Sequence, residues 1–261
     1  MSKIATLIGL MRSLLIYWKP GRQYGLRNFY KDLVAEGDLV FDIGSHLGDR
    51  SSAFARLGAE VVSIEPQPEV NKWLKKIVGR NPQITIRKVA VGSSPGTIEL
   101  SVSQLTPTVS TVAGSWKDKI VDVNPTFSWV KWDHKITTRV VTLDNLIAKY
   151  GVPNYCKIDV EGHELEVLKG LTHDLELISF EFVYGDVKSA ISCVQYLEGL
   201  GSYEYNFVLG ESKKFQLEEW VDSKMMKQLL VLEKSSSGDL YARLIEKNDT
   251  GRETWLKSGH A

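Results

Sequence analysis

The sequence predicts an α/β fold in which a mostly parallel, doubly wound sheet carries helices on both faces. From residue 38 onward, short apolar runs alternate with segments of helical periodicity, which is the pattern of βαβ units. Several of these runs are continuously apolar, as in parallel strands that are buried on both faces. With 261 residues, 43% of them hydrophobic, the chain can form one domain with a substantial core.

The net charge indicates which partners to expect, and the cysteines indicate the cellular location. Lys and Arg total 32 and Asp and Glu total 32, so the formal net charge is zero, and the chain lacks the overall basic character that favours nucleic-acid binding. We therefore predict no nucleic-acid partner. Cys156 and Cys193 lie far apart in the sequence, which favours reduced thiols and a cytoplasmic location.

Residues 1–36 are predicted to form an N-terminal helical extension. Apolar residues recur at helical spacing within 4–18, which indicates an amphipathic helix. Arg12 interrupts this run, and the run is shorter than the roughly 20 residues of a membrane-spanning helix. We therefore predict no transmembrane segment, and we expect the helix to pack on the domain. The alternative is peripheral contact of residues 3–18 with a membrane or a partner.

The main domain is predicted to span 37–247, followed by a C-terminal tail at 248–261. Glycines bound its first strand and end its first helix, as is common where the chain turns. The first βαβ unit consists of a strand at Leu39–Ile43, a helix at Asp49–Leu57, a strand at Glu60–Ile64 and a helix at Pro68–Val78.

Two more strands precede a long interruption, and the alternation of strands and helices then resumes. The later strands are expected at Ile84–Val91, Thr97–Val102, Thr137–Val141, Tyr155–Val160, Leu177–Val183, Tyr203–Leu209 and Asp239–Ile245. The later helices are expected at Leu143–Tyr150, Gly162–Lys169 and Lys188–Leu197.

The interruption at 103–136 is predicted to be a long loop or lid that contacts the acceptor. It contains Trp116, Trp129 and Trp132 among polar residues and prolines. Burial of such large aromatic surfaces favours an ordered segment over a free coil.

A strand that runs into a glycine turn and opens a helix is the strongest local signal, at residues 41–49. Gly44 permits the tight turn, and Gly48 permits close approach at the start of the helix. Glu65 follows 21 residues after Gly44, at the end of the next strand, where its carboxylate can accept bonds from both ribose hydroxyls. Together these residues predict a nucleoside-binding site.

The glycine pattern favours S-adenosylmethionine over a nicotinamide dinucleotide as the cofactor. The dinucleotide fingerprint has three glycines to admit a pyrophosphate, whereas this turn has two. Asp42 adds an acidic side chain that can hold an ammonium group. The enzyme alternative is an NAD(P)-dependent oxidoreductase on a similar sheet, and the non-enzyme alternative is a binding module of the same fold.

A second cluster of acidic residues lies where the strand at 155–160 ends and the chain enters the next helix. Asp159 and Glu161 share one strand face by the two-residue period, and His163 follows them, so each is a candidate general base. Glu166 is interpreted as a residue that faces water and favours the positive end of the next helix, and Glu164 is open to the same interpretation. Asp159, Glu161 and His163 also form a potential metal set, but no spaced His or Cys ligands occur and we predict no metal.

At these clusters the chain resembles the FkbM-type methyltransferases. The resemblance covers most of residues 24–245 and is carried by several short motifs in a fixed order. They are Tyr24-Gly25, the segment Val40 to Gly48, Ile64-Glu65-Pro66, the segment Val89 to Gly92, the segment Thr142 to Leu146, the segment Lys157 to Glu164, and the segment Gly238 to Ala242.

The resemblance implies a seven-stranded, Rossmann-like methyltransferase sheet and O-methylation of a hydroxyl on a sugar, glycan or other small natural product. By position, it implies that the turn from Gly44 to Gly48, including Ser45 and His46, holds the methionine part of S-adenosylmethionine. The remaining implied cofactor residues are Glu65 with Pro66 at the ribose, Val89 with Ala90 at the adenine, and Asp159 near the methyl group. This chain departs from the family pattern at Ser45-His46, which stands where Ala-Asn is usual, and at His163, which replaces a common Ala.

Overall fold

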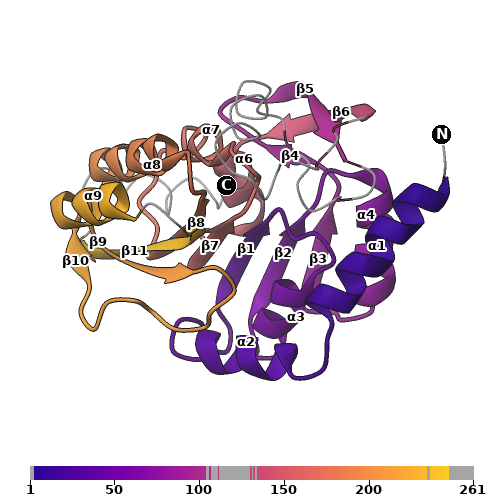
Figure 1. The fold of residues 1–261 in the computed structure, drawn as a ribbon, viewed down its shortest axis with the longest axis horizontal. Coiled ribbons are helices and arrows are strands. Elements are labelled where there is room, and N and C mark those ends of the chain that lie inside the picture. The colour runs from indigo at the N-terminus through magenta and orange to yellow at the C-terminus, as the bar shows by residue number, and fades with distance from the viewer. Residues whose placement is uncertain are drawn as a thin grey trace, which may run out of the picture.

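The computed structural model describes residues 3–103, 106, 111, 130, 132, 134–233 and 236–246. Its main feature is a mixed eight-stranded sheet with helices on both faces (Figure 1). In spatial order the strands are β10 (Val221–Asp222), β9 (Ser202–Leu209), β11 (Gly238–Glu246), β8 (Leu177–Phe182), β7 (Tyr155–Ile158), β1 (Leu39–Ile43), β2 (Glu60–Ile64) and β3 (Ile84–Arg87).

The strand directions confirm the α/β class, whereas the number of strands in the main sheet is eight rather than the expected seven. Strands β3, β2, β1, β7 and β8 run parallel, whereas β11 is antiparallel to both β8 and β9. The eighth strand is β10, an edge strand of two residues that pairs with β9. A strand this short has no periodicity that a sequence pattern could reveal.

A smaller sheet corrects the predicted single strand over residues 84–91. The chain leaves the main sheet after β3, and β4 (Ala90–Val91) joins β6 (His134–Val141) and β5 (Gly96–Val102) in the order β4-β6-β5. No glycine or proline marks the break at residues 88–89. Strand β6 begins at His134, so the predicted loop ends before 136. Most of that loop, including Trp116 and Trp129, lies outside the described residues, as does the predicted tail at 248–261.

Alternate residues of the parallel strands face different layers of helices. Phe41 and Ile43 belong to one core cluster, and Val40 belongs to the other. The first cluster is covered by α6 (Leu143–Tyr150), α7 (Glu164–Leu168), α8 (Val187–Leu200) and α9 (Ser223–Leu232), and the second by α2 (Arg22–Tyr30), α3 (Asp49–Ala55) and α4 (Pro68–Ile77) (Figure 1). Both faces of the parallel strands are therefore buried, as the continuous apolar runs predict.

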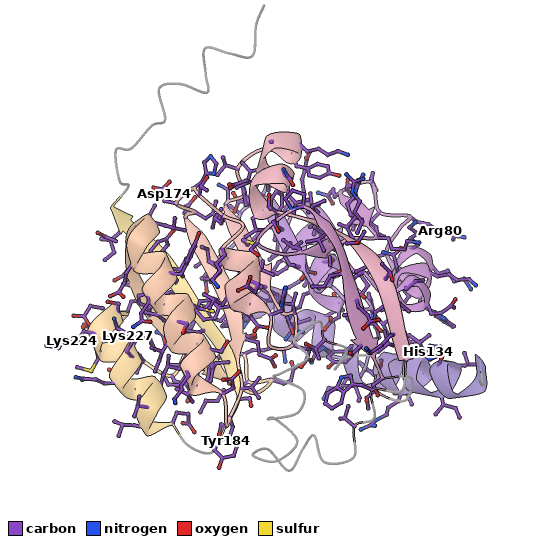
Figure 2. All side chains as sticks on the ribbon, turned by 90° about the horizontal axis from the view of Figure 1, so that it is seen from above. Arg80, His134, Asp174, Tyr184, Lys224 and Lys227 are labelled. Carbon is purple, nitrogen blue, oxygen red and sulfur yellow. The ribbon has the colours of Figure 1, made fainter. Side chains whose placement is uncertain are left out.

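Helix α9 has no counterpart in the sequence-based prediction, and α2 lies within the helical extension predicted at 1–36 without having been predicted as a separate helix. Helix α2 carries Gly25 in its interior, and glycine weakens a helical pattern. Helix α9 begins after Asp222, whose Oδ1 accepts a bond from the backbone N of Met225 at 2.7 Å. Lys227 of α9, labelled in Figure 2, binds the Glu198 carboxylate of α8 at 2.9 Å.

The predicted N-terminal helix is present as α1 (Lys3–Tyr17). Leu10 packs with Leu47 and Val70 in a small core cluster, so this face of the helix is fixed to the domain. Another face is exposed, with Leu15 at 74% and Ile8 at 56%. Within the described residues, no helix has both the length and the apolar character needed to cross a bilayer.

Candidate active site

A pocket of about 250 Å³ lies at the carboxyl ends of β1, β2 and β7. This is the edge of a parallel sheet at which α/β proteins bind ligands. All but one of the sequence-predicted site residues line it. They are Asp42, Gly44, Ser45, His46, Glu65, Pro66, Val89, Ala90, Asp159, Glu161 and His163.

Gly44 makes the turn that brings β1 close to the strand beside it. Its φ is +81°, and a Cβ built on it would lie 1.7 Å from the backbone oxygen of Asp159. Only glycine is free of both restrictions here. Gly48, by contrast, does not line the pocket, and a Cβ on it would lie 2.6 Å from Leu74 Cδ1. Gly48 therefore allows α3 and α4 to approach each other.

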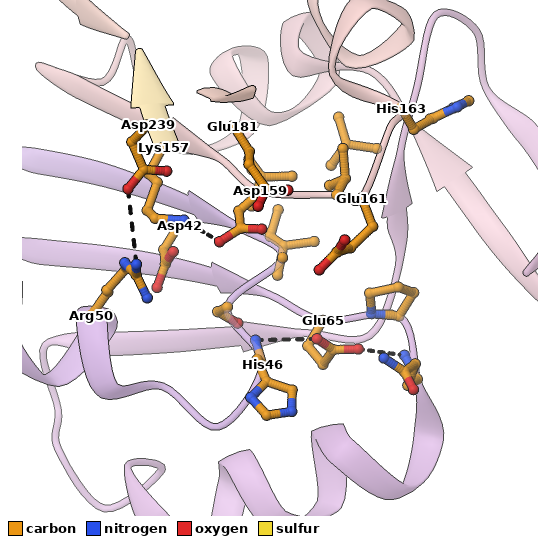
Figure 3. Close-up of a pocket in the computed structure, with 18 of the residues that line it drawn as sticks. Asp42, His46, Arg50, Glu65, Lys157, Asp159, Glu161, His163, Glu181 and Asp239 are labelled. Atoms are coloured by element: carbon orange, nitrogen blue, oxygen red, sulfur yellow. Dashed lines mark hydrogen bonds and ion pairs between the residues drawn. The ribbon is translucent and has the colours of Figure 1, made fainter. Parts of the chain in front are cut away.

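Glu65 is held in place by two backbone N–H groups, one from the turn after β1 and one from the residue before α4. Its Oε2 accepts a bond from the N of His46 at 3.1 Å, and its Oε1 accepts one from the N of Gln67 at 2.9 Å (Figure 3). The side chain is buried, and burial raises the pKa of Glu65 to about 7. The fixed carboxylate lines the pocket, where it can accept hydroxyl donors from a ligand.

Asp42 is buried on the α3 side of β1. One oxygen, Oδ2, accepts a bond from Ser51 Oγ. The other, Oδ1, is buried and has no hydrogen-bond partner among the described residues. Burial is the main cause that raises the pKa of Asp42. A buried polar atom without a partner is costly, so Asp42 is suited to a donor that a ligand brings.

Lys157 is a site residue that sequence reasoning missed. It is 1% exposed, and its Nζ donates to Asp159 Oδ2 at 2.7 Å. Burial alone would raise the pKa of Asp159, but the charges of Lys157 and Arg50 together lower it below its ordinary value. Asp159 therefore stays ionised. The available signal was a lysine inside the otherwise apolar strand β7.

Asp159, Glu161 and Glu181 form a cluster in which one carboxylate oxygen of each lies within 4.8 Å of the others. Burial, and then the charges of Asp159 and Glu164, raise the pKa of Glu161 well above its ordinary value. Burial, and then Glu161 and Asp159, do the same to the pKa of Glu181. Sequence reasoning missed Glu181, although an acidic residue in the buried strand β8 was a signal. Carboxylates in this arrangement can hold protons or a hard cation.

The remaining polar residues of the second motif have separate roles. Glu164 Oε1 accepts bonds from the backbone N atoms of Val160 at 3.2 Å and Gly162 at 3.1 Å, so it holds the loop before α7. Glu166 pairs with Lys169 on the surface, which matches the interpretation that it faces water. His163 lines the pocket, but its ring is turned away from the carboxylates in Figure 3. Burial lowers its pKa.

The fold and this site define an α/β protein with a pocket at the carboxyl ends of its parallel strands, where a glycine turn follows the first strand and an acid follows the second. The family model described as the methyltransferase FkbM domain matches residues 42–234. The chain therefore belongs to the FkbM methyltransferase family, which confirms the resemblance predicted from its motifs.

One curated relative is the hexuronic acid methyltransferase AglP of Haloferax volcanii, which is 30% identical over 151 residues. The match covers 57% of this chain and spans only 56% of that protein's length. A precorrin-6y C5,15-methyltransferase from Geobacter metallireducens has a TM-score of 0.45 at 11% identity, with 85% of this chain and 88% of that chain covered. An O-methyltransferase from Bacillus cereus in complex with SAH has a TM-score of 0.42 at 14% identity, with 94% and 92% covered.

Proposed function

We propose that this protein is an S-adenosylmethionine-dependent O-methyltransferase that acts on a hydroxyl of a sugar, glycan or other small natural product. Membership of the FkbM family supports methyl transfer. The observation that carries the cofactor assignment is Glu65, whose carboxylate is fixed by two backbone N–H groups at the end of β2 and lines the pocket.

The described residues of the pocket fit the groups of this cofactor. Glu65 would bind the two ribose hydroxyls, and the apolar side chains of Val89 and Ala90 would lie along the adenine. The unpartnered Oδ1 of Asp42 would accept from the ammonium of the methionine part. Ser45 Oγ and His46 Nε2 are also buried and have no hydrogen-bond partner among the described residues, so the turn offers further polar contacts to the cofactor. When bound, S-adenosylmethionine supplies an electrophilic methyl group on a positively charged sulfur.

Glu161 is the proposed general base. A base works best when its pKa lies near the operating pH, and burial beside other carboxylates raises the pKa of Glu161. Asp159 is kept ionised by Lys157, which suits a fixed negative charge close to a cationic cofactor better than proton transfer. His163 is the weaker candidate, because its ring is turned away from these groups (Figure 3).

A carbohydrate acceptor is proposed from the relative that modifies hexuronic acid. Proton removal from a sugar hydroxyl needs a base in the pocket, and the cluster of Asp159, Glu161 and Glu181 provides carboxylates there. Methyl transfer to a set of sugars and uronates, followed with a radiolabelled methyl donor, would identify the acceptor. Cofactor binding without turnover on any acceptor would favour the binding-module alternative.

Titration with S-adenosylhomocysteine tests the cofactor without knowledge of the acceptor. We expect the wild type to bind, and Glu65→Ala to bind roughly 10- to 100-fold more weakly, because hydrogen bonds to a charged group are lost. Isothermal titration calorimetry measures both affinities. Glu69→Ala, at an exposed position in the first turn of α4, is the matched control. Absence of binding by the wild type, together with binding of NADH, would replace this proposal with the oxidoreductase alternative.

Removal of divalent metal is expected to leave methyl transfer unchanged. Burial and mutual repulsion raise the pKa values of Glu161 and Glu181, so we propose that the cluster relieves its charge by sharing one proton rather than by binding a cation, and that Glu161 acts as the base when it is ionised. Initial rates would be compared before and after dialysis against EDTA. A loss of rate that Mg²⁺ or Mn²⁺ restores would show instead that Asp159, Glu161 and Glu181 bind a cation.

A further inference from the structure

Arg50 is a cation in the pocket that no sequence motif singled out. It is the second residue of α3, directly after the turn that ends at Gly48, and it lines the pocket. In Figure 3 it lies on the opposite side of the pocket from Glu65, beyond Asp42. Its side chain is 14% exposed, so its charge is largely withdrawn from water.

The ion pairs of Arg50 are long. Its guanidinium nitrogens lie 3.6 Å from Glu211, 3.9 Å from Asp49 and 3.9 Å from Asp239, distances beyond a hydrogen bond. Its Nε is buried and has no partner among the residues that the structure describes. Arg22 is different, since it donates to Asp49 at 2.7 Å and to Glu211 at 2.9 Å.

The positive charge of Arg50 is therefore balanced by nearby carboxylates, while N–H donors of its guanidinium remain available for a ligand. The surrounding carboxylates make its burial tolerable, yet their distances of 3.6 to 3.9 Å are too long for hydrogen bonds to its guanidinium. Arginine presents donors in a planar fork that matches a carboxylate. Lys157 also lines the pocket, but its Nζ already donates to Asp159 Oδ2 at 2.7 Å. Among the described lining residues, Arg50 is thus the cation best placed to receive a carboxylate.

The order of the strands indicates which carboxylate this is. Strands β3, β2 and β1 are consecutive in the sheet, and they lead in turn to Val89 and Ala90, to Glu65 and to Gly44. A ligand whose ribose is bound by Glu65 and whose adenine lies toward β3 extends its other end past Gly44 toward Asp42 and Arg50. At that position the ammonium of an amino-acid group would face the Asp42 carboxylate, and its carboxylate would face the Arg50 guanidinium.

We propose that the Arg50 guanidinium binds the α-carboxylate of the methionine part of the cofactor, next to an ammonium held by Asp42. This inference rests on the proposed function, because it presumes that the pocket binds S-adenosylmethionine. It assigns the amino-acid end of the ligand to a side chain of α3 rather than to the backbone of the glycine turn alone.

Two ligands separate this role from a structural one. S-adenosylhomocysteine has the amino-acid group, whereas 5′-methylthioadenosine lacks it and keeps the adenine and ribose. Calorimetric titration of both would be made on wild type, Arg50→Met, Arg50→Lys and Arg56→Met. Arg56 is exposed at the end of the same helix and is the matched control.

We expect Arg50→Met to bind S-adenosylhomocysteine roughly 10- to 100-fold more weakly than wild type. We expect its affinity for 5′-methylthioadenosine to change less than about twofold, because that ligand makes no bond to Arg50. Arg50→Lys should recover part of the loss, and Arg56→Met should bind both ligands normally. Retained binding of 5′-methylthioadenosine shows that Arg50→Met is folded, and circular dichroism checks this independently of either ligand.

The outcomes distinguish this inference from the proposed function. If Arg50→Met weakens both ligands equally, or weakens neither, Arg50 does not bind the carboxylate and the inference is wrong, while the cofactor assignment stands. A wild type that binds neither ligand overturns the cofactor assignment, and the inference with it.

Discussion

Replacement of Glu161 by glutamine is expected to lower the rate of methyl transfer roughly 10²- to 10⁴-fold, the usual contribution of a general base. Glutamine keeps the size of the side chain but cannot accept a proton from the acceptor. The affinity for S-adenosylhomocysteine should be unchanged, because Glu161 is not among the proposed cofactor contacts. Initial rates with a radiolabelled methyl donor, together with calorimetry, measure both quantities.

The pH profile gives an independent measure of the same role. Glu161 must be ionised to act as a base, and its pKa is raised well above 4.5. The rate should therefore rise with pH through that raised pKa and fall below it, and the residual rate of Glu161→Gln should lose this dependence. Glu166→Gln, at a surface residue paired with Lys169, is the control. A Glu161→Gln variant with the wild-type rate would exclude Glu161 as the base.

Gly44→Ala is expected to destabilise the protein by more than about 4 kcal/mol, a size that single substitutions reach only through a specific structural conflict. Two conflicts combine here. The φ of +81° is strained for alanine, and the new Cβ would overlap the backbone oxygen of Asp159 at 1.7 Å. Relief of the overlap requires β1 and the residues after β7 to move apart, and this movement would also distort the pocket. Urea unfolding measures the loss.

Gly96→Ala is the matched control, because nothing lies within 4 Å of a Cβ built there and its φ is not positive. Its effect on the free energy of unfolding should stay within about 1 kcal/mol. If Gly44→Ala unfolds at the wild-type urea concentration, the close approach of the turn to Asp159 is not present in the protein.

Much of the main sheet was predictable, because its parallel strands are buried on both faces and therefore appear in the sequence as continuous apolar runs. Leu39–Ile43 and Glu60–Ile64 match β1 and β2 to the residue. The turn at Gly44 was predictable because its backbone conformation needs a residue without a side chain. Glu65 was predictable because it stands at the end of a predicted strand.

The errors occur where local patterns carry no information on sheet membership. Residues 84–91 contain one β-type pattern but form parts of two sheets. Gly48 has the spacing of a pocket residue, yet it serves the packing of α3 on α4, because the side chain of Leu74 fills the space beside it. Neither distinction exists until distant segments pack together.

The sequence by itself determined the fold class, the glycine turn and the acidic residues that end the strands, since these depend on local periodicity and on backbone freedom. The chemistry of the site was decided by the tertiary structure. Lys157 holds Asp159 ionised, Glu181 of β8 meets Glu161, and Arg50 lies across the pocket from Glu65. The reason is that pKa values and hydrogen-bond partners depend on burial and on neighbours far away in the sequence, which adjacent parallel strands bring to one edge.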